Sequence, residues 1–153
     1  MSQENELRPI LIVEDDPDDR FLIEKAFREK RVPNPTRALR DGEEMMDYLK
    51  RRGSFAEMES LPRPCIILLD LNMPRMDGRK ALLYLKSDPE LKRIPVLVLS
   101  TSNAEEDIVR SYNLGANSFI RKPVQFDGLL GLADSIRDYW LGRVELPNHG
   151  IHS

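Results

Sequence analysis

The sequence predicts a doubly wound α/β fold, in which a parallel sheet of five strands is covered by five helices on its two faces. Short runs rich in Ile, Leu and Val alternate with longer amphipathic stretches throughout the chain. Nearly unbroken apolar runs are typical of strands that are buried on both faces of a parallel sheet. Five strand-then-helix units in succession imply right-handed crossovers and therefore a three-layer sandwich. A length of 153 residues suits one such domain.

The five expected strands differ in how apolar they are. The runs at residues 9–13, 65–69 and 96–99 consist almost entirely of apolar side chains, whereas those at 36–39 and 118–121 are interrupted by polar ones. We therefore expect the three apolar strands at the centre of the sheet and the two interrupted strands nearer its edges.

The first helix is expected at residues 17–30, because the residues at its start match a helix N-terminus. Asp16 is a candidate N-cap, and Pro17 suits the first helical position. Asp18 and Asp19 then fall in the first turn, where the helix dipole favours negative charge. Capping and dipole effects explain these three acidic residues, so we assign them no role as ligands.

Four further helices are expected after the later strands. They cover residues 43–52, 78–86, 105–114 and 126–141. The last of them has apolar residues at helical spacing along one face, and Gly142 ends it. The domain is therefore expected at residues 8–141, between an N-terminal tail at 1–7 and a C-terminal tail at 142–153.

Composition disfavours several classes of function. Lys and Arg number 23 against 26 Asp and Glu, and the resulting net charge of -3 offers no basic excess for nucleic acid or anionic lipid. The single cysteine, Cys65, excludes an intramolecular disulfide and a cysteine-based metal site. No apolar run approaches the length of about 20 residues needed to cross a membrane. These features favour a cytoplasmic protein that binds neither nucleic acid nor membrane.

Polar side chains directly follow four of the five expected strands. They are Glu14, Asp15 and Asp16 after the first strand, Asp70 after the third, Ser100 and Thr101 after the fourth, and Lys122 after the fifth. In an open parallel sheet, ligands bind beyond the carboxyl ends of the strands. We therefore expect these side chains to converge on one edge of the sheet and to form a site there.

The chemistry of this set points to phosphoryl transfer. Neighbouring carboxylates repel by about 3 to 4 kcal/mol at an effective dielectric of roughly 20, so a divalent cation and Lys122 are needed to balance them. Oxygen ligands without His or Cys favour Mg²⁺, which also binds phosphate oxygens. A carboxylate can attack phosphorus to form an aspartyl phosphate, and Asp70 is the candidate because it follows the most central run. Ser100 and Lys122 would hold the phosphoryl oxygens.

Five segments of the chain resemble the receiver domain of two-component response regulators. They are Ile-Val-Glu-Asp-Asp at 12–16, Leu-Leu-Asp-Leu-Asn-Met-Pro-Arg-Met-Asp-Gly at 68–78, Val-Leu-Ser-Thr at 98–101, Leu-Gly-Ala-Asn-Ser-Phe at 114–119 and Arg-Lys-Pro at 121–123. Their order and spacing are those of the family, and the resemblance covers about residues 8–141. It implies the flavodoxin-like strand order 2-1-3-4-5.

The resemblance also implies a metal site. Asp70 is then the phosphoacceptor, with Glu14 and Asp15 as the acidic pair beside it. Asp15, Asp70 and the backbone carbonyl of Asn72 are the implied protein ligands of Mg²⁺. Glu14 stands where many receivers have Asp, and its longer side chain can shift its contact with the metal from direct to water-mediated.

Further implied roles concern the response to phosphorylation. Ser100 is the implied switch hydroxyl, and Phe119 is the implied switch aromatic. Lys122 is expected to bridge the phosphate and to form a cis peptide bond with Pro123. These residues would report the change to the face formed by the fourth helix, the fifth strand and the fifth helix.

The resemblance implies a single-domain response regulator that accepts a phosphoryl group from a histidine kinase. It would signal through protein binding or dimerisation and would turn over only by slow hydrolysis of its own phosphate. The loop at 53–64 and the Tyr-Trp-Leu-Gly segment at 139–142 resemble the small regulators paired with phytochrome-type histidine kinases. Because those regulators are generally homodimers, we expect a homodimer through the fourth helix, fifth strand, fifth helix and C-terminal tail.

Two other functions are compatible with parts of the sequence. A receiver fold could serve as a phosphorylation-independent adaptor or dimerisation module, although a scaffold has no need of so many converging charges. A phosphatase with an aspartyl nucleophile would typically have a second Asp two residues after the nucleophile, where this chain has Asn72. Both are therefore weaker interpretations than the phosphorylation switch.

Overall fold

The computed structural model describes residues 8–56, 62–71, 78–102 and 104–147. These residues form a parallel five-stranded sheet in the order β2-β1-β3-β4-β5, which confirms the expected strand order. The strands are β1 (Ile10–Val13), β2 (Thr36–Leu39), β3 (Ile66–Asp70), β4 (Val96–Ser100) and β5 (Ser118–Arg121). Each strand begins and ends within about one residue of its predicted run.

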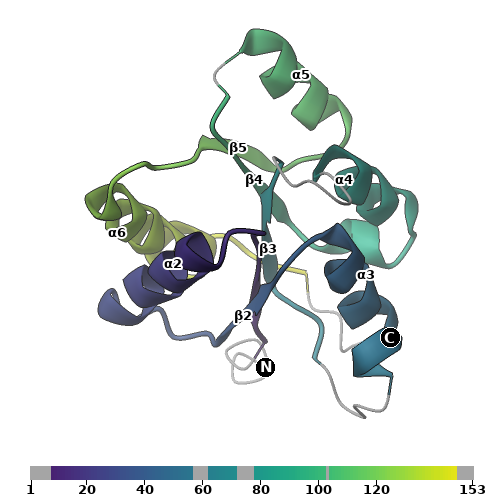
Figure 1. Ribbon diagram of the computed structural model, residues 1–153, viewed down its shortest axis with the longest axis horizontal. Coiled ribbons are helices and arrows are strands. Elements are labelled where there is room, and N and C mark those ends of the chain that lie inside the picture. Colours follow the sequence, from purple (N-terminus) through teal and green to yellow (C-terminus); the bar gives the residue numbers. More distant parts are fainter. Residues whose placement is uncertain (1–7, 57–61, 72–77, 103, 148–153) are drawn as a thin grey trace.

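Helices cover both faces of this sheet (Figure 1). Helices α2 (Pro17–Glu29) and α6 (Phe126–Ser135) lie side by side on one face, and α3 (Gly42–Lys50) and α4 (Gly78–Ser87) lie on the other. Helix α5 (Glu105–Asn113) lies beside the edge strand β5. Short helical turns occur at η1 (Gly53–Phe55), η2 (Leu91–Arg93) and η3 (Ile136–Trp140). Among the described helices, none has the length and apolar character to cross a membrane.

The three central strands are buried along their whole length because helices cover both of their faces. Successive side chains of a strand point to opposite faces, so each strand contributes to two cores. Ile10, Ile12, Ile66, Leu68, Leu97 and Leu99 belong to the core under α2 and α6, and Leu11, Val13, Ile67, Leu69, Val96 and Val98 belong to the core under α3 and α4. The predicted central position of β1, β3 and β4 is therefore confirmed.

Helix α2 begins as its sequence predicts. Asp16 Oδ1 accepts hydrogen bonds from the backbone N–H groups of Asp18 and Asp19 at 2.8 and 3.2 Å. Pro17 lies in the first turn, where a backbone N–H would have no acceptor within the helix, so proline loses no hydrogen bond there. This cap begins α2 directly after the acidic β1–α2 turn, at the carboxyl edge of the sheet.

The C-terminal helix differs from the single helix expected at 126–141. Helix α6 ends at Ser135, and the chain continues over Ile136–Trp140 as a wider π-type turn, η3. Arg137 in this turn donates a hydrogen bond to the carbonyl of Lys30 at 2.6 Å, which ties η3 to the end of α2. The chain therefore stays helical to Trp140, close to the predicted end, but its last turn is wider than an α-helical turn.

Gly78 begins helix α4 directly against the end of β3. A Cβ atom at this position would lie 2.5 Å from the carbonyl oxygen of Asp70 and 2.5 Å from the Cα atom of Leu71. We therefore expect Gly78→Ala to lower the free energy of unfolding by about 1–3 kcal/mol, the usual cost of overpacking. Urea denaturation followed by circular dichroism would measure this change.

Gly131→Ala is the matched control, because a Cβ atom at Gly131 in helix α6 meets nothing within 4 Å. This variant should be as stable as the wild type or up to about 1 kcal/mol more stable, since alanine favours a helix over glycine. An unchanged unfolding midpoint for Gly78→Ala would contradict the close approach of α4 to β3.

Candidate functional site

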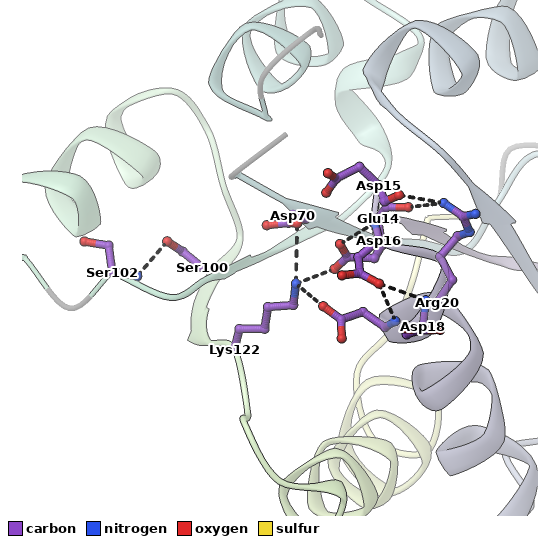
Figure 2. Close-up of polar contacts among 10 residues, drawn as sticks. Glu14, Asp15, Asp16, Asp18, Arg20, Asp70, Ser100, Ser102 and Lys122 are labelled. Carbon is purple, nitrogen blue, oxygen red and sulfur yellow. Dashed lines mark hydrogen bonds and ion pairs between the residues drawn. The ribbon is translucent and has the colours of Figure 1, made fainter. Parts of the chain in front are cut away.

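Three carboxylates meet at the carboxyl edge of the sheet. Glu14 and Asp15 follow β1, and Asp70 is the last residue of β3. Strands β1 and β3 pair with Val13 opposite Leu69, so the residues that come next lie side by side. One oxygen from each of the three carboxylates lies within 4.8 Å of the others, and Figure 2 shows the cluster. The structure therefore brings these three predicted site residues together.

Lys122, which follows β5, brings its ammonium group into the same cluster (Figure 2). Its Nζ lies 2.6 Å from Glu14 Oε1, 3.0 Å from Asp19 Oδ2 and 3.5 Å from Asp70 Oδ2. The lysine side chain is 15% exposed, and those of Glu14 and Asp70 are each 2% exposed. Ion pairs shielded from water in this way are stronger than pairs on the surface. Lys122 therefore balances part of the negative charge of the site.

Asp19 belongs to the site, although the sequence predicts only a helix-terminus role for it. Its carboxylate contacts Lys122 from the first turn of α2. The sequence holds no separate signal for this contact, because capping and the helix dipole already account for the acidic residues at the start of α2. Which of Asp18 and Asp19 faces Lys122 depends on the direction of α2, and that direction is set by packing on the sheet.

Backbone contacts hold the β1–α2 turn in place. Arg20 Nη1 donates hydrogen bonds to the carbonyl oxygens of Glu14 and Asp15 at 2.8 and 3.2 Å. The N–H of Asp16 donates to Glu14 Oε2 at 3.1 Å. One oxygen of the Glu14 carboxylate thus faces Lys122 and the other binds the backbone. The acidic side chains of this turn are therefore positioned before any ligand arrives.

Burial and charge shift the pKa values of the two central groups. Burial raises the pKa of Glu14 from 4.5 to about 7; the contact with Lys122 opposes this rise, and the charge of Asp70 adds to it. Burial alone would lower the pKa of Lys122, but its contacts with Glu14 and Asp19 outweigh that effect and hold its pKa above the usual range. Lys122 therefore stays protonated, while Glu14 takes up a proton near neutral pH.

The carboxylate cluster fits a divalent cation. The grouped donors in the described part of the chain are carboxylate oxygens, without imidazole or thiolate. Such a set suits Mg²⁺ or Mn²⁺ better than Zn²⁺. Lys122 supplies one positive charge against the three clustered carboxylates and Asp19, so a bound divalent cation would neutralise most of the negative charge that remains. Asn72, the remaining implied ligand, lies outside the described residues.

Ser100 lies beside the cluster and faces away from it. It is fully buried at the end of β4, one residue beyond the position paired with Asp70. Its hydroxyl oxygen accepts a hydrogen bond from the N–H of Ser102 at 3.1 Å. Figure 2 shows the Ser100 side chain directed toward Ser102 and away from Asp70. A contact between Ser100 and a group on Asp70 would therefore require the serine side chain to turn.

Phe119 lies on the edge strand β5 and is half-buried against the core under α3 and α4. Its backbone N–H donates a hydrogen bond to the hydroxyl of Tyr112 in helix α5 at 3.2 Å. The implied switch aromatic is thus joined to α5 rather than to the carboxylate cluster.

The expectation of a cis peptide bond before Pro123 is wrong. No peptide bond among the described residues is cis, so the bond between Lys122 and Pro123 is trans. The trans form is favoured by about 0.5–1 kcal/mol at bonds that precede proline. With a trans bond, the N–H of Lys122 still donates to the carbonyl of Ser100 at 2.8 Å, and the long side chain reaches the carboxylates.

The raised pKa of Glu14 predicts a pH-dependent stability of the metal-free protein. In the folded state Glu14 keeps its proton up to about pH 7, whereas in the unfolded chain it loses the proton near its usual pKa of 4.5. The folded state thus holds more protons than the unfolded state in this interval. The free energy of unfolding should therefore fall as the pH rises through the interval. Denaturant unfolding in the presence of a chelator would measure the slope.

Glu14→Gln is the comparison variant, because glutamine has a similar shape and does not titrate. The difference in unfolding free energy between this variant and the wild type should increase in favour of the variant as the pH rises. A constant difference between about pH 5 and pH 8 would contradict the raised pKa of Glu14.

Comparisons with known proteins agree with this geometry. The family model of the response regulator receiver domain matches residues 10–134. The response regulator Rcp1 of Synechocystis sp. is 40% identical over 148 residues, which cover 96% of this chain and 99% of Rcp1. The crystal structure of the Mn²⁺-bound form of Rcp1 matches with a TM-score of 0.81 at 38% identity, over 92% of this chain and 99% of that one.

A second solved structure is similar over the same extent. The phosphorylated cyanobacterial phytochrome response regulator RcpA matches with a TM-score of 0.83 at 44% identity, over 93% of this chain and 99% of that one. The family model and both relatives therefore match most of the chain. This protein belongs to the receiver-domain family of response regulators, which are phosphorylation-based signalling switches.

Proposed function

We propose that Asp70 accepts a phosphoryl group from the phosphohistidine of a histidine kinase. The observation that carries this proposal is the setting of the Asp70 carboxylate. It is nearly buried at the end of the central strand β3, and it lies 3.5 Å from the ammonium of Lys122. Glu14 and Asp15 stand beside it and complete a site for a cation and a phosphoryl group.

The transfer requires one bond to form and one to break. An Asp70 carboxylate oxygen bonds to phosphorus while the bond from phosphorus to the kinase histidine nitrogen breaks. The bonding electrons remain on the imidazole nitrogen, which is protonated, and the product is an aspartyl acyl phosphate. Lys122 stabilises the negative charge on the phosphoryl oxygens by its proximity. We expect no turnover other than slow hydrolysis of this acyl phosphate.

We propose Mg²⁺ as the metal. Asp15, Asp70 and the backbone carbonyl of Asn72 would hold it, with Glu14 bound directly or through water. When bound, Mg²⁺ neutralises charge on both the carboxylates and the phosphoryl oxygens. Rcp1 matches nearly the whole chain, and one of its crystal structures is of the Mn²⁺-bound form. This supports a divalent cation at the site proposed here.

Phosphorylation is proposed to act on the surface through Ser100 and Phe119. A phosphate group adds roughly -1.5 to -2 charges, enough to bias a loop between two arrangements. Ser100 would turn its hydroxyl from Ser102 to a phosphoryl oxygen, and Phe119 would repack on β5. The face that changes is formed by α5, β5 and α6.

The kinase partner is proposed to be of the phytochrome type, and the location to be the cytoplasm. RcpA is a cyanobacterial phytochrome response regulator, and its similarity to this chain over nearly the full length supports the same pairing. A histidine kinase takes its phosphoryl group from ATP, which cells hold in the cytoplasm. The signal would therefore pass between two proteins in the cytoplasm.

Labelling with a small phosphodonor tests the acceptor residue. With Mg²⁺ and radioactive acetyl phosphate, the wild type should take up label that hydroxylamine removes. Asp70→Asn should reduce the label by about tenfold or more, because an amide does not form an acyl phosphate. Asp88→Asn is the control, since Asp88 pairs with Lys50 away from this cluster, and it should keep the label. Equal labelling of Asp70→Asn and the wild type would disprove the proposal.

We also propose that the protein forms a homodimer through the face of α5, β5 and α6. Ser111 is the only buried residue of α5, a helix whose residues are all described. Val109 and Tyr112 on the same helix are 46% and 49% exposed. Exposed apolar groups gathered on one helix are typical of a surface that binds another protein.

The C-terminal tail is proposed at 142–153, after a receiver unit at 8–141, and its contacts lie within its own domain rather than on the proposed dimer face. In its described part, Leu146 packs against the core under α2 and α6. Arg8 Nη1 donates a hydrogen bond to the carbonyl of Pro147 at 2.9 Å. These contacts support a tail that stabilises its own domain, so the support for the dimer comes mainly from α5.

Val109→Lys tests this dimer, because it places a charge among the exposed apolar residues of α5. We expect it to weaken self-association by about tenfold or more, a change of about 1.4 kcal/mol. Sedimentation velocity with and without Mg²⁺ and beryllofluoride would measure the effect. Phe21→Lys, at a 58% exposed position on α2, is the control and should associate normally.

Equal association of Val109→Lys and the wild type would contradict this interface. Association that does not respond to beryllofluoride in the wild type would favour the phosphorylation-independent adaptor instead.

A further inference from the structure

Three carboxylates lie around the ammonium of Lys122 before any phosphoryl group arrives. Glu14, Asp19 and Asp70 each place an oxygen within 3.5 Å of its Nζ. An ammonium group carries three protons and can donate to three acceptors at once. Glu14 and Asp19 lie at hydrogen-bonding distance, and Asp70 lies farther away, so a phosphoryl oxygen on Asp70 competes mainly with Glu14 and Asp19 for this ammonium.

Asp70 would itself carry the phosphoryl group, so burial determines which of the other two carboxylates, Glu14 or Asp19, gives way more easily. The side chains of Glu14 and Asp70 are each 2% exposed, whereas that of Asp19 is 39% exposed. Separating a buried carboxylate from its cation leaves a charge that water cannot reach, which is strongly unfavourable. Asp19 can instead exchange its contact with Lys122 for contacts with water. It is therefore the partner that Lys122 loses most easily.

We propose that Asp19 is a placeholder for the phosphoryl group. Asp19 occupies Lys122 in the unphosphorylated protein, and a phosphoryl oxygen on Asp70 displaces it. This inference rests on the proposed phosphorylation of Asp70 and adds a residue that regulates the same site. Asp19 acts only through Lys122, so it is a positioning residue, and the exchange replaces one ion pair by another without making or breaking a covalent bond.

The exchange predicts the direction of a measurable effect. Because Asp19 competes with the phosphoryl group for Lys122, this pair lowers the affinity of the site for such a group. Removing the charge of Asp19 should therefore raise that affinity. Partly exposed ion pairs change equilibria by about two- to fivefold, which is the size of effect expected here.

The experiment compares Asp19→Asn with Asp18→Asn. Both variants remove one negative charge from the first turn of α2, and both keep the backbone N–H that the Asp16 cap binds. Asp18 is exposed and takes no part in the contacts of Lys122 described above. Titration calorimetry with beryllofluoride, at saturating Mg²⁺ and about 0.15 M salt, measures the affinity for a phosphoryl mimic. Thermal unfolding with and without the mimic supplies the second readout.

We expect Asp19→Asn to bind beryllofluoride about two- to fivefold more tightly than Asp18→Asn. The gain in unfolding temperature on adding the mimic should also be larger for Asp19→Asn. A merely structural role for Asp19 would lower the stability of the free and bound forms equally and would leave the affinity unchanged.

Equal affinities of the two variants would overturn the placeholder role, and weaker binding by Asp19→Asn would overturn it as well. In both cases, normal binding and labelling of the wild type would leave the proposed function intact. A wild type that binds no beryllofluoride and takes up no label on Asp70 would instead overturn the proposed function, and the placeholder role with it.

Discussion

The site depends on one ammonium group placed among carboxylates that have little access to water. Two carboxylates about 4 Å apart repel by about 4 kcal/mol at an effective dielectric of roughly 20. Glu14 and Asp70 are both nearly buried, so each needs a cation beside it or a proton. The pKa of Glu14, raised to about 7, shows that Lys122 offsets this requirement only in part. A divalent cation is the natural complement to such a site.

The order of the strands is what allows this arrangement. Two strands, β3 and β4, separate β1 from β5, yet the residues that follow β1 and β5 are in contact. Because all five strands are parallel, their carboxyl ends lie at one edge, and each crossover returns the chain to the opposite edge. The N–H of Lys122 is bound to the end of β4, and its long side chain then reaches past β3 to Glu14.

Local patterns predict the strands and the polar residues that follow them, because apolar runs and parallel topology together determine both. Two features depend on contacts that the sequence does not reveal. The π-type turn after Ser135 is tied to the distant Lys30 by Arg137. Asp19 reaches the site because of the direction in which α2 packs on the sheet.

The contacts around Ser100 connect the site to helix α5. Ser102 donates its N–H to the Ser100 hydroxyl, and its own hydroxyl donates to Asp107 in the first turn of α5 at 2.7 Å. Asp107 in turn pairs with Arg79 of helix α4 at 3.2 Å. If Ser100 turns toward a group on Asp70, the N–H of Ser102 loses its acceptor, and Ser102, which binds the first turn of α5 through Asp107, is held less firmly. Because Ser111 is the only buried one among the described residues of α5, few buried contacts oppose a change in the position of this helix.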